Sequence, residues 1–571
     1  MDNQRNMIMA IVLSALVLFG WSAISRHYFP TANPPVTKTV DGKQVALPNP
    51  TVDAPAVLRD RAVVLAETPR LKIDTPAVAG SINLKGLRLD DLVLKKHRET
   101  IDEKSPPIRL LSPGGAAKAY FANFGWTGEG LRVPGNDTVW QTNATVLTPA
   151  QPATLFWENG EGQRFEVTVS VDADYLFTIT QRVANHGASA VAARPFALVS
   201  RVGKSADPDG WTMHTGPISY WDGQAHFDVN YPDLDKQGAE GTRFSIADGW
   251  LGFGDKYWLT ALVPDAKSAV DAALFARSTD NYTAVFNPPS ATLLAPGKAA
   301  TITSRFFAGA KDVSLLERYD REGITRLNLA IDWGWFRWFE VPIFHVLDWL
   351  FKLVGNFGVA ILLLTVIVRG LMFPIAQKQF ASMAGMRALQ PKMKALQERY
   401  KDDKPKLQQE MLSLYKTEKV NPLAGCLPIV LQIPIFYALY KVLMLTIEMR
   451  HQPFIWWIHD LSAPDPMTPV NLFGLLNFTP PAFLALGVLP ILLGITMYLQ
   501  FKLNPAPTDE IQKQVFGIMP WIFMFIMAPF AAGLQLYWVM SNTLTILQQK
   551  WLYSRHPALL AAEGKQEPKA K

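Results

Sequence analysis

Five long stretches with almost no charged residues dominate the last part of the chain and constrain its fold more than any other feature. They lie at residues 354–374, 423–447, 482–503, 515–530 and 533–552. Each approaches the roughly 20 apolar residues that a helix needs to cross a bilayer. Because lipid offers backbone groups no hydrogen-bond partners, we expect all five to be helices. A tight turn joins the last two, which predicts a helical hairpin.

A sixth apolar run occupies residues 7–24, with Arg5 before it and Arg26 after it. A cleaved signal peptide is one interpretation, since Ala23–Ser25 offers small residues for cleavage. The run is longer than the usual signal core of about 7–15 residues, so we favour an uncleaved transmembrane anchor over residues 1–28. Under either interpretation, the residues that follow are exported.

The exported part is typical of a water-exposed β domain. Residues 29–67 are rich in proline and predict an extended linker. From 68 to 330, apolar and polar residues alternate, most clearly in the segments that flank a turn at 172–174. This period of two indicates antiparallel strands with one buried face. We therefore predict a large antiparallel β-sandwich domain.

The texture changes at residues 331–353, where four Trp and four Phe stand among scattered charges. Rings with a polar edge favour the boundary between membrane and water. An interfacial amphipathic helix is therefore the favoured interpretation, and an ordinary core helix is the alternative.

Basic residues near the apolar segments predict their orientation. Segment 376–421 carries ten Lys or Arg against five Asp or Glu, whereas the loop 448–481 carries only Arg450. The tail 553–571 is also basic. We expect 376–421 and both chain termini in the cytoplasm, the loop and the β domain outside, and six transmembrane helices in all.

Helical spacing within the cytoplasmic segment predicts a helical hairpin at 376–421 inside a helical core of residues 354–552. The apolar positions recur at Leu389, Met393, Leu396 and Tyr400, and again at Leu407, Met411, Leu414 and Tyr415. Met383, Met386 and Met393 would supply adaptable contacts. The basic surface could attract anionic lipid, ribosomal RNA or acidic nascent segments. A plain solvated hairpin is the alternative.

Motifs for enzymatic chemistry are missing from the sequence. It contains no Walker loop, no His-Glu-x-x-His and no Gly-x-Ser-x-Gly elbow. The nine His show no metal-ligand spacing, and the single Cys426 cannot form an intrachain disulfide. We therefore predict a protein that is not an enzyme and that needs no cofactor or metal.

Arg369 is the feature that most suggests a functional site, because it lies in the inner half of an apolar segment. An arginine at a helix centre costs about 2.5–3.5 kcal/mol. By position alone, snorkelling to the interface is an equally good explanation, and for Lys441 it is the favoured one. Other polar residues in the apolar segments would serve either as interhelical glue or as the lining of a wet cavity. They are Thr365, Gln432, Gln500, Gln535, Ser541 and Asn542.

Long ordered stretches resemble the bacterial YidC family. They include GNFGVAILLLTVIVRGLMFPIAQKQF, PFIWWIHDLSAPDP and LQLYWVMSNTLTILQQ, while DGWLGFGDKYWLTALVPD is similar to the periplasmic domain of Gram-negative members. The resemblance implies a polytopic α-helical inner-membrane protein that inserts and folds nascent membrane proteins. The implied partners are these substrates, the Sec translocon with its accessory subunits, ribosome–nascent chain complexes and lipid, and a monomer would suffice.

The resemblance also implies a hydrophilic groove that opens to the cytoplasm and to lipid. The matching positions are Arg369, Thr365, Gln432, Gln500 and Trp538. Trp538 replaces the Tyr of some relatives, so a hydroxyl role is not carried over. The hairpin positions Met383, Met386, Arg387 and Met393 would contact substrate or ribosome. The stretch around 470–485 is longer than in some relatives, and we assign it no role.

Two other functional classes compete with insertion. A secondary transporter would also place polar groups in the bilayer, but it usually shows internal repeats, which we do not find in this sequence. A purely structural assembly factor or chaperone would need no arginine within the membrane. This class overlaps with insertion, because the resemblance implies that family members also help substrates to fold beside the Sec translocon.

Overall fold

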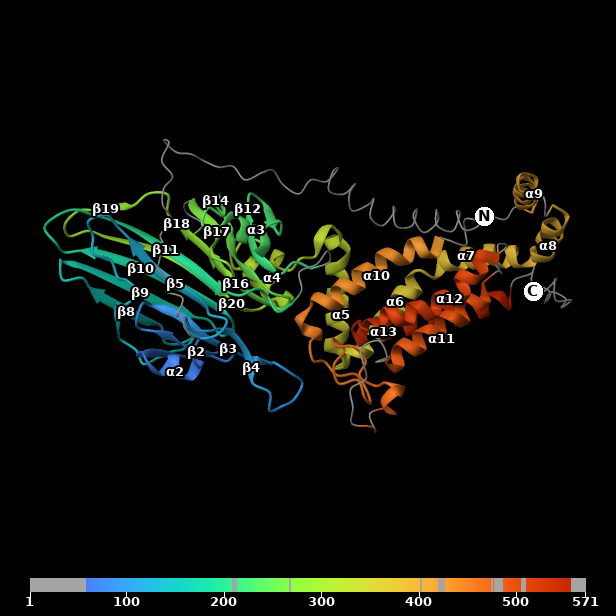
Figure 1. The fold of residues 1–571 in the computed structure, drawn as a ribbon, viewed down its shortest axis with the longest axis horizontal. Helices are drawn as coiled ribbons and strands as arrows, with labels where there is room; N and C mark the ends of the chain where they lie inside the picture. Colours follow the sequence, from blue (N-terminus) through green and yellow to red (C-terminus); the bar gives the residue numbers. More distant parts are fainter. Residues whose placement is uncertain are drawn as a thin grey trace. The chain divides into compact units, whose positions relative to one another are not determined.

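The computed structural model describes residues 58–207, 213–265, 269–400, 403–418, 427–473, 476, 486–504 and 510–555. The predicted anchor, most of the linker, most of the basic tail and most of the 470–485 stretch lie outside these residues. Contacts divide the chain into two compact units. The first contains the residues up to Asp332 except Thr100–Ser105, and the second contains Thr100–Ser105 and the residues from Trp333 on. The first consists mainly of strands and the second of helices (Figure 1).

Two large sheets form the first unit. The nine-stranded sheet has the order β13-β12-β15-β16-β20-β10-β9-β8-β6. Its strands are β6 (Gln141–Thr142), β8 (Ala153–Glu158), β9 (Gln163–Val171), β10 (Leu176–Asn185), β12 (Gly216–Trp221), β13 (Gln224–His226), β15 (Trp250–Gly254), β16 (Trp258–Val263) and β20 (Ala299–Ala310).

The eleven-stranded sheet has the order β14-β17-β18-β11-β5-β3-β2-β1-β7, with β19 paired to β11 and β4 to β3. Its strands are β1 (Arg70–Asp74), β2 (Val78–Asn83), β3 (Arg88–Arg98), β4 (Pro107–Leu111), β5 (Tyr120–Thr127), β7 (Val146–Leu147), β11 (Val191–Val202), β14 (Thr242–Ile246), β17 (Val270–Ser278), β18 (Asn281–Asn287) and β19 (Thr292–Leu294).

The strand pairing confirms the antiparallel character that the alternation predicts. β9 and β10 form a hairpin across the predicted turn, with Val171 opposite Phe177. Every second residue of β9 is buried. The pairing of β1 with β7 is a parallel exception.

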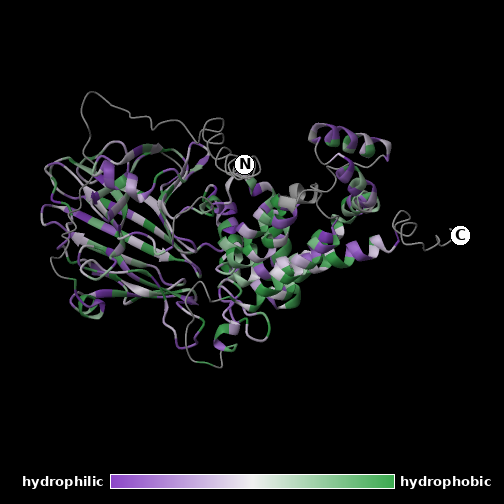
Figure 2. Cartoon of the chain, turned by 45° about the vertical axis from the view of Figure 1, so that its right-hand side comes forward, coloured by the Kyte–Doolittle hydropathy of each residue, from purple (hydrophilic) through white to green (hydrophobic). Residues whose placement is uncertain are grey.

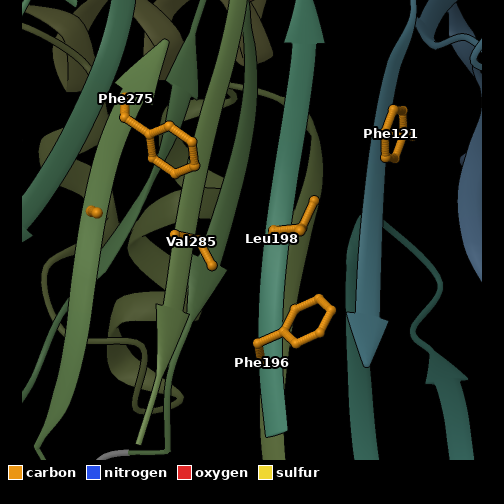
Figure 3. Packing of buried hydrophobic residues seen from close by; sticks show 6 residues of the cluster. Phe121, Phe196, Leu198, Phe275 and Val285 are labelled. Atoms are coloured by element: carbon orange, nitrogen blue, oxygen red, sulfur yellow. The ribbon is translucent and has the colours of Figure 1, made fainter. Parts of the chain in front are cut away.

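Apolar side chains cover both faces of the eleven-stranded sheet. On one face, Phe124 contacts Phe306 of the other sheet. On the opposite face of β5 lies Phe121, because successive side chains alternate. It belongs to an apolar cluster with Phe196, Leu198, Ala273, Phe275 and Val285, spread over neighbouring strands (Figure 3). The sheet therefore buries apolar surface on both sides.

The linker prediction is wrong for its last residues, because the helix α2 (Arg61–Ala66) forms there. The Asp60 side chain caps it by accepting a hydrogen bond from the Ala62 amide at 2.8 Å. Arg61 forms an ion pair with Asp91 of β3. A cap and a charge partner thus dock this segment on the β domain. Two further helices, α3 (Tyr231–Gln237) and α4 (Val313–Arg321), complete the unit.

The second unit is a helical bundle. Its helices are α5 (Arg337–Val354), α6 (Phe357–Leu371), α7 (Phe373–Ala388), α8 (Gln390–Arg399), α9 (Lys404–Thr417), α10 (Leu427–Leu445), α11 (Val488–Leu503), α12 (Glu510–Met527) and α13 (Ala532–Tyr553). α13 packs on α6 and α11, α12 on α11, and α10 on α5. Apolar residues predominate in the bundle (Figure 2).

None of the described helices is by itself both long and apolar enough to cross a bilayer. α6 meets this requirement only together with the first part of α7, as Phe357–Leu371 plus Phe373–Phe380, with a bend of 60° between them. The number of transmembrane helices therefore stays a prediction.

The segment predicted as a hairpin contains three helices in the structure. α7 continues the chain beyond the bend, and α8 and α9 then pack on each other. The Tyr415 hydroxyl lies 3.9 Å from the Met393 sulfur, and Lys392 forms an ion pair with Glu418 at 2.5 Å. Lys441 does not follow the snorkelling interpretation, because it is only 2% exposed inside the bundle.

Candidate functional site

A cavity of about 480 Å³ lies among the helices of the second unit. This volume is within the range of roughly 300–1,000 Å³ of ligand pockets. Its lining is shared by six helices: Arg369, Met372, Ile375, Ala376, Gln379, Phe380, Met383, Gln432, Ile433, Phe436, Met497, Gln500, Phe501, Asn504, Phe516, Met519, Trp538, Ser541, Asn542, Thr545, Gln548 and Gln549.

Among the described residues of this lining, Arg369 is the one that carries a charge. It stands in the last turn of α6, and its Nε donates a hydrogen bond to the Ser541 hydroxyl of α13 at 3.1 Å. Its Nη2 donates to the same oxygen. No ion pair of Arg369 occurs among the residues that the structure describes. A hydroxyl group thus orients the guanidinium without neutralising its charge.

One face of α13 supplies a polar stripe along the cavity. Residues 541, 542, 545, 548 and 549 recur at the spacing of a helix face and all carry hydroxyl or amide groups. With Trp538 the stripe covers twelve residues, which is about 16 Å at 1.5 Å per residue. That length is about half of a hydrocarbon core of roughly 30 Å.

The structure brings Gln432, Gln500 and Trp538 to the same cavity as Arg369. The Gln432 amide nitrogen donates to the Tyr537 hydroxyl at 2.9 Å. The Trp538 ring lies between Phe436 of α10 and Phe523 of α12, at centroid distances of 5.0 and 4.9 Å. Its Nε1 is buried and has no hydrogen-bond partner among the described residues. These rings border the polar stripe at one end.

Thr365 departs from its predicted place. It is fully buried, it is not part of the cavity lining, and its hydroxyl donates to the Ile361 carbonyl of its own helix at 2.7 Å. A threonine one turn from Arg369 shares its helix face, and α6 packs against α13. The hydroxyl therefore satisfies itself on the backbone instead of facing the cavity.

The methionines predicted as external contacts are mainly internal. Met383 packs with Phe380 and Tyr553, and Met386 lies against this cluster. Met393 is 7% exposed and contacts α9. The side chain of Arg387 lies outside the described residues. Burial of Met393 favours a packing role over a surface for partners, whereas Met383 packs within the bundle and also lines the cavity.

Several lining residues were not predicted from the sequence. Gln379 lies on α7, and Asn504 lies just after the end of α11. The Nε2 of Gln549 donates a hydrogen bond to the Oδ1 of Asn504 at 3.0 Å. The sequence contains a signal for the lining residues of α13 only. Thr545, Gln548 and Gln549 continue, at helical spacing, the polar face that begins at Ser541. No spacing predicts which distant helix that face meets.

The chemistry of the cavity is limited to charge and hydrogen bonding. The polar groups of its described lining residues are amides, hydroxyls, the Trp538 indole N–H and one guanidinium. Within the described part of the chain, no three His, Cys, Asp or Glu side chains gather at a possible metal site. The lining residues that the structure describes include no carboxylate, imidazole or thiol that would act as a general base or nucleophile. The arrangement suits reversible binding of polar or acidic groups.

Comparisons with known proteins find matches for both units in the same family of membrane proteins. The family model described as 60Kd inner membrane protein matches residues 349–558, and the YidC periplasmic domain model matches residues 70–346. A relative from Zymomonas mobilis, named membrane protein insertase YidC, is 48% identical over 97% of this chain and 96% of its own length.

A second relative with the same name, from Methylorubrum extorquens, is 43% identical over 97% of this chain and 96% of its own length. A solved structure titled as an active YidC insertase covers 85% of this chain and 97% of its own, at 17% identity and a TM-score of 0.35.

Proposed function

Since the chain belongs to the YidC family of membrane protein insertases, we propose that it inserts and folds nascent inner-membrane proteins through the cavity around Arg369. Its relatives and family models make it an inner-membrane protein with a periplasmic domain rich in antiparallel sheet. We further propose that the cavity opens to the cytoplasm and that the protein works with the partners named below.

The observation that carries the proposal is the position of the Arg369 side chain. An arginine that snorkels would extend along its helix to the interface. Here the guanidinium faces a cavity and bonds to Ser541 of another helix. A buried charge without a carboxylate partner is costly unless water or a ligand solvates it. A hydrated cavity is therefore the environment that best supports this geometry.

We expect substrate tails to enter this cavity from the cytoplasm. The polar stripe would shorten the apolar path by about half, so a short tail would not face the full hydrocarbon thickness. Arg369 would attract acidic groups in the tail by charge alone. Outward transfer of each negative charge would then gain about 2.3 kcal/mol per 100 mV of membrane potential.

The apolar part of the substrate would leave between α10 and α12. Both helices contribute to the lining, through residues such as Ile433 and Met519. α12 packs on α11, whereas α10 packs on α5 and more lightly on α13. Each helix is thus held in place by other helices. The two could separate without losing these contacts, which supports a lateral exit between α10 and α12. Burial in lipid would stabilise the inserted segment.

The wider proposal follows the family. The chain would cross the membrane six times, with both termini and the helices α8 and α9 in the cytoplasm. The cavity would then open toward the cytoplasm. The protein would act alone or with the Sec translocon and its accessory subunits, and would receive ribosome–nascent chain complexes. It would hydrolyse no ATP, and a monomer would suffice.

The test is insertion of a small single-span protein into vesicles that contain only this protein, without nucleotide. We expect insertion by the wild-type protein. Arg369→Ala should slow it about tenfold, because losing about 1.4 kcal/mol of attraction changes a rate by that factor. Acidic-tailed substrates should be affected more than neutral ones.

Lys502→Ala is the matched control. Lys502 is an exposed cation near the end of α11 and outside the cavity lining. Wild-type rates for Arg369→Ala with every substrate would refute the role of the cavity charge. Rates lowered equally by both variants would indicate a general effect of surface charge.

A further inference from the structure

Two apolar side chains are displayed on the loop between α10 and α11. Trp456 is 79% exposed and Ile455 is 44% exposed. An isolated exposed apolar residue is common on protein surfaces. A tryptophan exposed to this extent beside an isoleucine is different, because together they present a large apolar surface.

The loop holds these side chains outward through a rigid turn. The Phe454 amide donates to the Ile458 carbonyl at 2.9 Å, and the Ile458 amide donates to the Ile455 carbonyl at 3.2 Å. Trp456 has a φ of 54°, a left-handed conformation that is rare for bulky residues. Such strain persists only where the surroundings enforce it. The exposure is therefore built into the loop.

The surroundings include both neighbouring rings and distant backbone. Trp457 stacks on Trp456 at 5.8 Å, and its Nε1 donates to Asp465 at 2.9 Å. The Gly533 amide, at the start of α13, donates to the Leu461 carbonyl at 2.9 Å. The turn is thus fixed to the bundle and cannot readily fold its rings inward.

The same loop docks on the corner between α5 and α6. The Asn356 side chain donates to the Phe454 carbonyl at 3.0 Å, and the Phe454 ring fills the space beside Gly358. Just before Asn356, Leu353 is 66% exposed and Val354 is also exposed. Exposed apolar side chains of α5 thus lie on the segment to which the Trp456 loop is bonded.

We infer that Ile455 and Trp456 form an anchor that inserts into the outer lipid–water interface, next to the end of α5. Lipid is the favoured occupant because the apolar residues continue from the loop to a helix of a membrane-embedded unit. Indole rings favour this boundary, since the ring is apolar and its N–H is polar. The inference rests on family membership and on the outward orientation of the loop, but not on the role of the cavity.

The anchor would set the depth of Arg369. Asn356 begins α6 at the level of the loop, and Arg369 follows thirteen residues later on the same helix. At 1.5 Å per residue this separation is about 20 Å along the helix axis. Within a core of roughly 30 Å, an anchor at the outer boundary places the guanidinium in the inner leaflet.

The test measures depth and requires no substrate. Cys426→Ser removes the only cysteine, and Ile455→Cys or Trp456→Cys in the full-length protein then carries a nitroxide. The protein is placed in vesicles of phosphatidylethanolamine and phosphatidylglycerol. Both labels should collide more with lipid-soluble oxygen than with a water-soluble nickel complex. Leu293→Cys, on exposed β19, should show the reverse order.

Two outcomes would overturn the inference. Greater access of nickel than of oxygen at both loop positions would mean that the loop lies in water. Low access of both reagents would mean that another protein surface covers the loop. An insertion defect of Arg369→Ala does not alter either reading, so the depth result and the cavity proposal fail independently.

Discussion

At the scale of single residues, the pairing of Arg369 with Ser541 explains how a cation is kept within an apolar helix. A carboxylate partner would hold the charge more firmly, but it would also cancel the attraction for acidic substrates. The hydroxyl accepts two hydrogen bonds from the guanidinium and leaves its charge available. Ser541 is thus a positioning residue for the proposed insertion.

Ser541→Ala should reduce insertion of acidic-tailed substrates without unfolding the protein. A hydrogen bond to a charged group contributes about 1.5–3 kcal/mol, so the expected loss is about tenfold or more. Ser541→Thr should restore activity because it retains the hydroxyl. Thr543→Ala is the control, since its hydroxyl bonds to the Val539 carbonyl of α13 itself. Equal rates for Ser541→Ala and Ser541→Thr would contradict the positioning role.

Lys311 carries a second prediction at this scale, in the β domain. Burial lowers the pKa of Lys311 to about 8, although Asp255, Asp332 and Asp207 oppose the shift. The unfolded chain therefore binds more protons between pH 8 and about 10.5, so the free energy of unfolding should rise with pH in that window. From pH 7 to 9.5 we expect a rise of roughly 2 kcal/mol.

Urea unfolding of the full-length protein in detergent, followed by pulsed proteolysis of the β domain, measures this rise. Lys311→Met should flatten the slope, and Lys298→Met, at an exposed lysine, should keep it. Burial raises the pKa of Tyr120 and Tyr231, so their contribution opposes the trend above about pH 10. A wild-type slope in Lys311→Met would exclude this lysine as the cause.

At the scale of elements, Gln535 connects two helices, which is one of the two alternatives that the sequence left open for it, and it is not part of the cavity lining. It is fully buried, and its Nε2 donates to the Met527 and Phe530 carbonyls, both at 2.8 Å. These carbonyls end α12 and form the turn to α13. Gln535 therefore fastens the hairpin of the last two helices.

Gln535→Leu should destabilise this hairpin by about 1–3 kcal/mol, because the buried Met527 carbonyl loses its partner. The expected readout is a lower midpoint of thermal unfolding in detergent. Thr543→Val, which removes a polar group bonded only within α13, should have a smaller effect. An unchanged midpoint in Gln535→Leu would show that water or another group satisfies this carbonyl.

Helix patterns in the sequence predicted part of the site. The cost of Arg369 in an apolar segment marked it, and the polar spacing on α13 indicated a face. Two features required the structure. Pro374, two residues after the break at Met372, has no N–H to bond to the Gly370 carbonyl and so explains why the helix breaks there. The direction of the bend, which turns Gln379 and Met383 toward the cavity, was visible only in the structure. Ser541 reaches Arg369 from a helix far along the chain, and no local rule predicts such a contact.

At the scale of the whole molecule, two sequence textures correspond to two units. Alternation with period two predicted antiparallel strands such as β9 of the nine-stranded sheet, because a core on one side and a more exposed face on the other select that pattern. The strands β5 and β18 of the eleven-stranded sheet are buried at nearly every position, so they do not show it. Long apolar segments predicted a helical bundle. Whether those helices enclose a cavity depends on the sizes of side chains at many contacts. Periodicity does not report these sizes, so it could not decide whether Arg369 snorkels to the interface or lines a wet cavity.

The central claim is that the cavity around Arg369 contains water when the protein is in a bilayer. Reaction of single cysteines with an anionic, membrane-impermeant methanethiosulfonate, in inverted vesicles and a Cys426→Ser background, tests it most directly. Thr545→Cys lies in the cavity lining, whereas Leu547→Cys faces outward and is about 3 Å nearer the inner surface. A wet cavity predicts faster labelling at Thr545→Cys. Faster labelling at Leu547→Cys, as depth alone requires, would contradict the account.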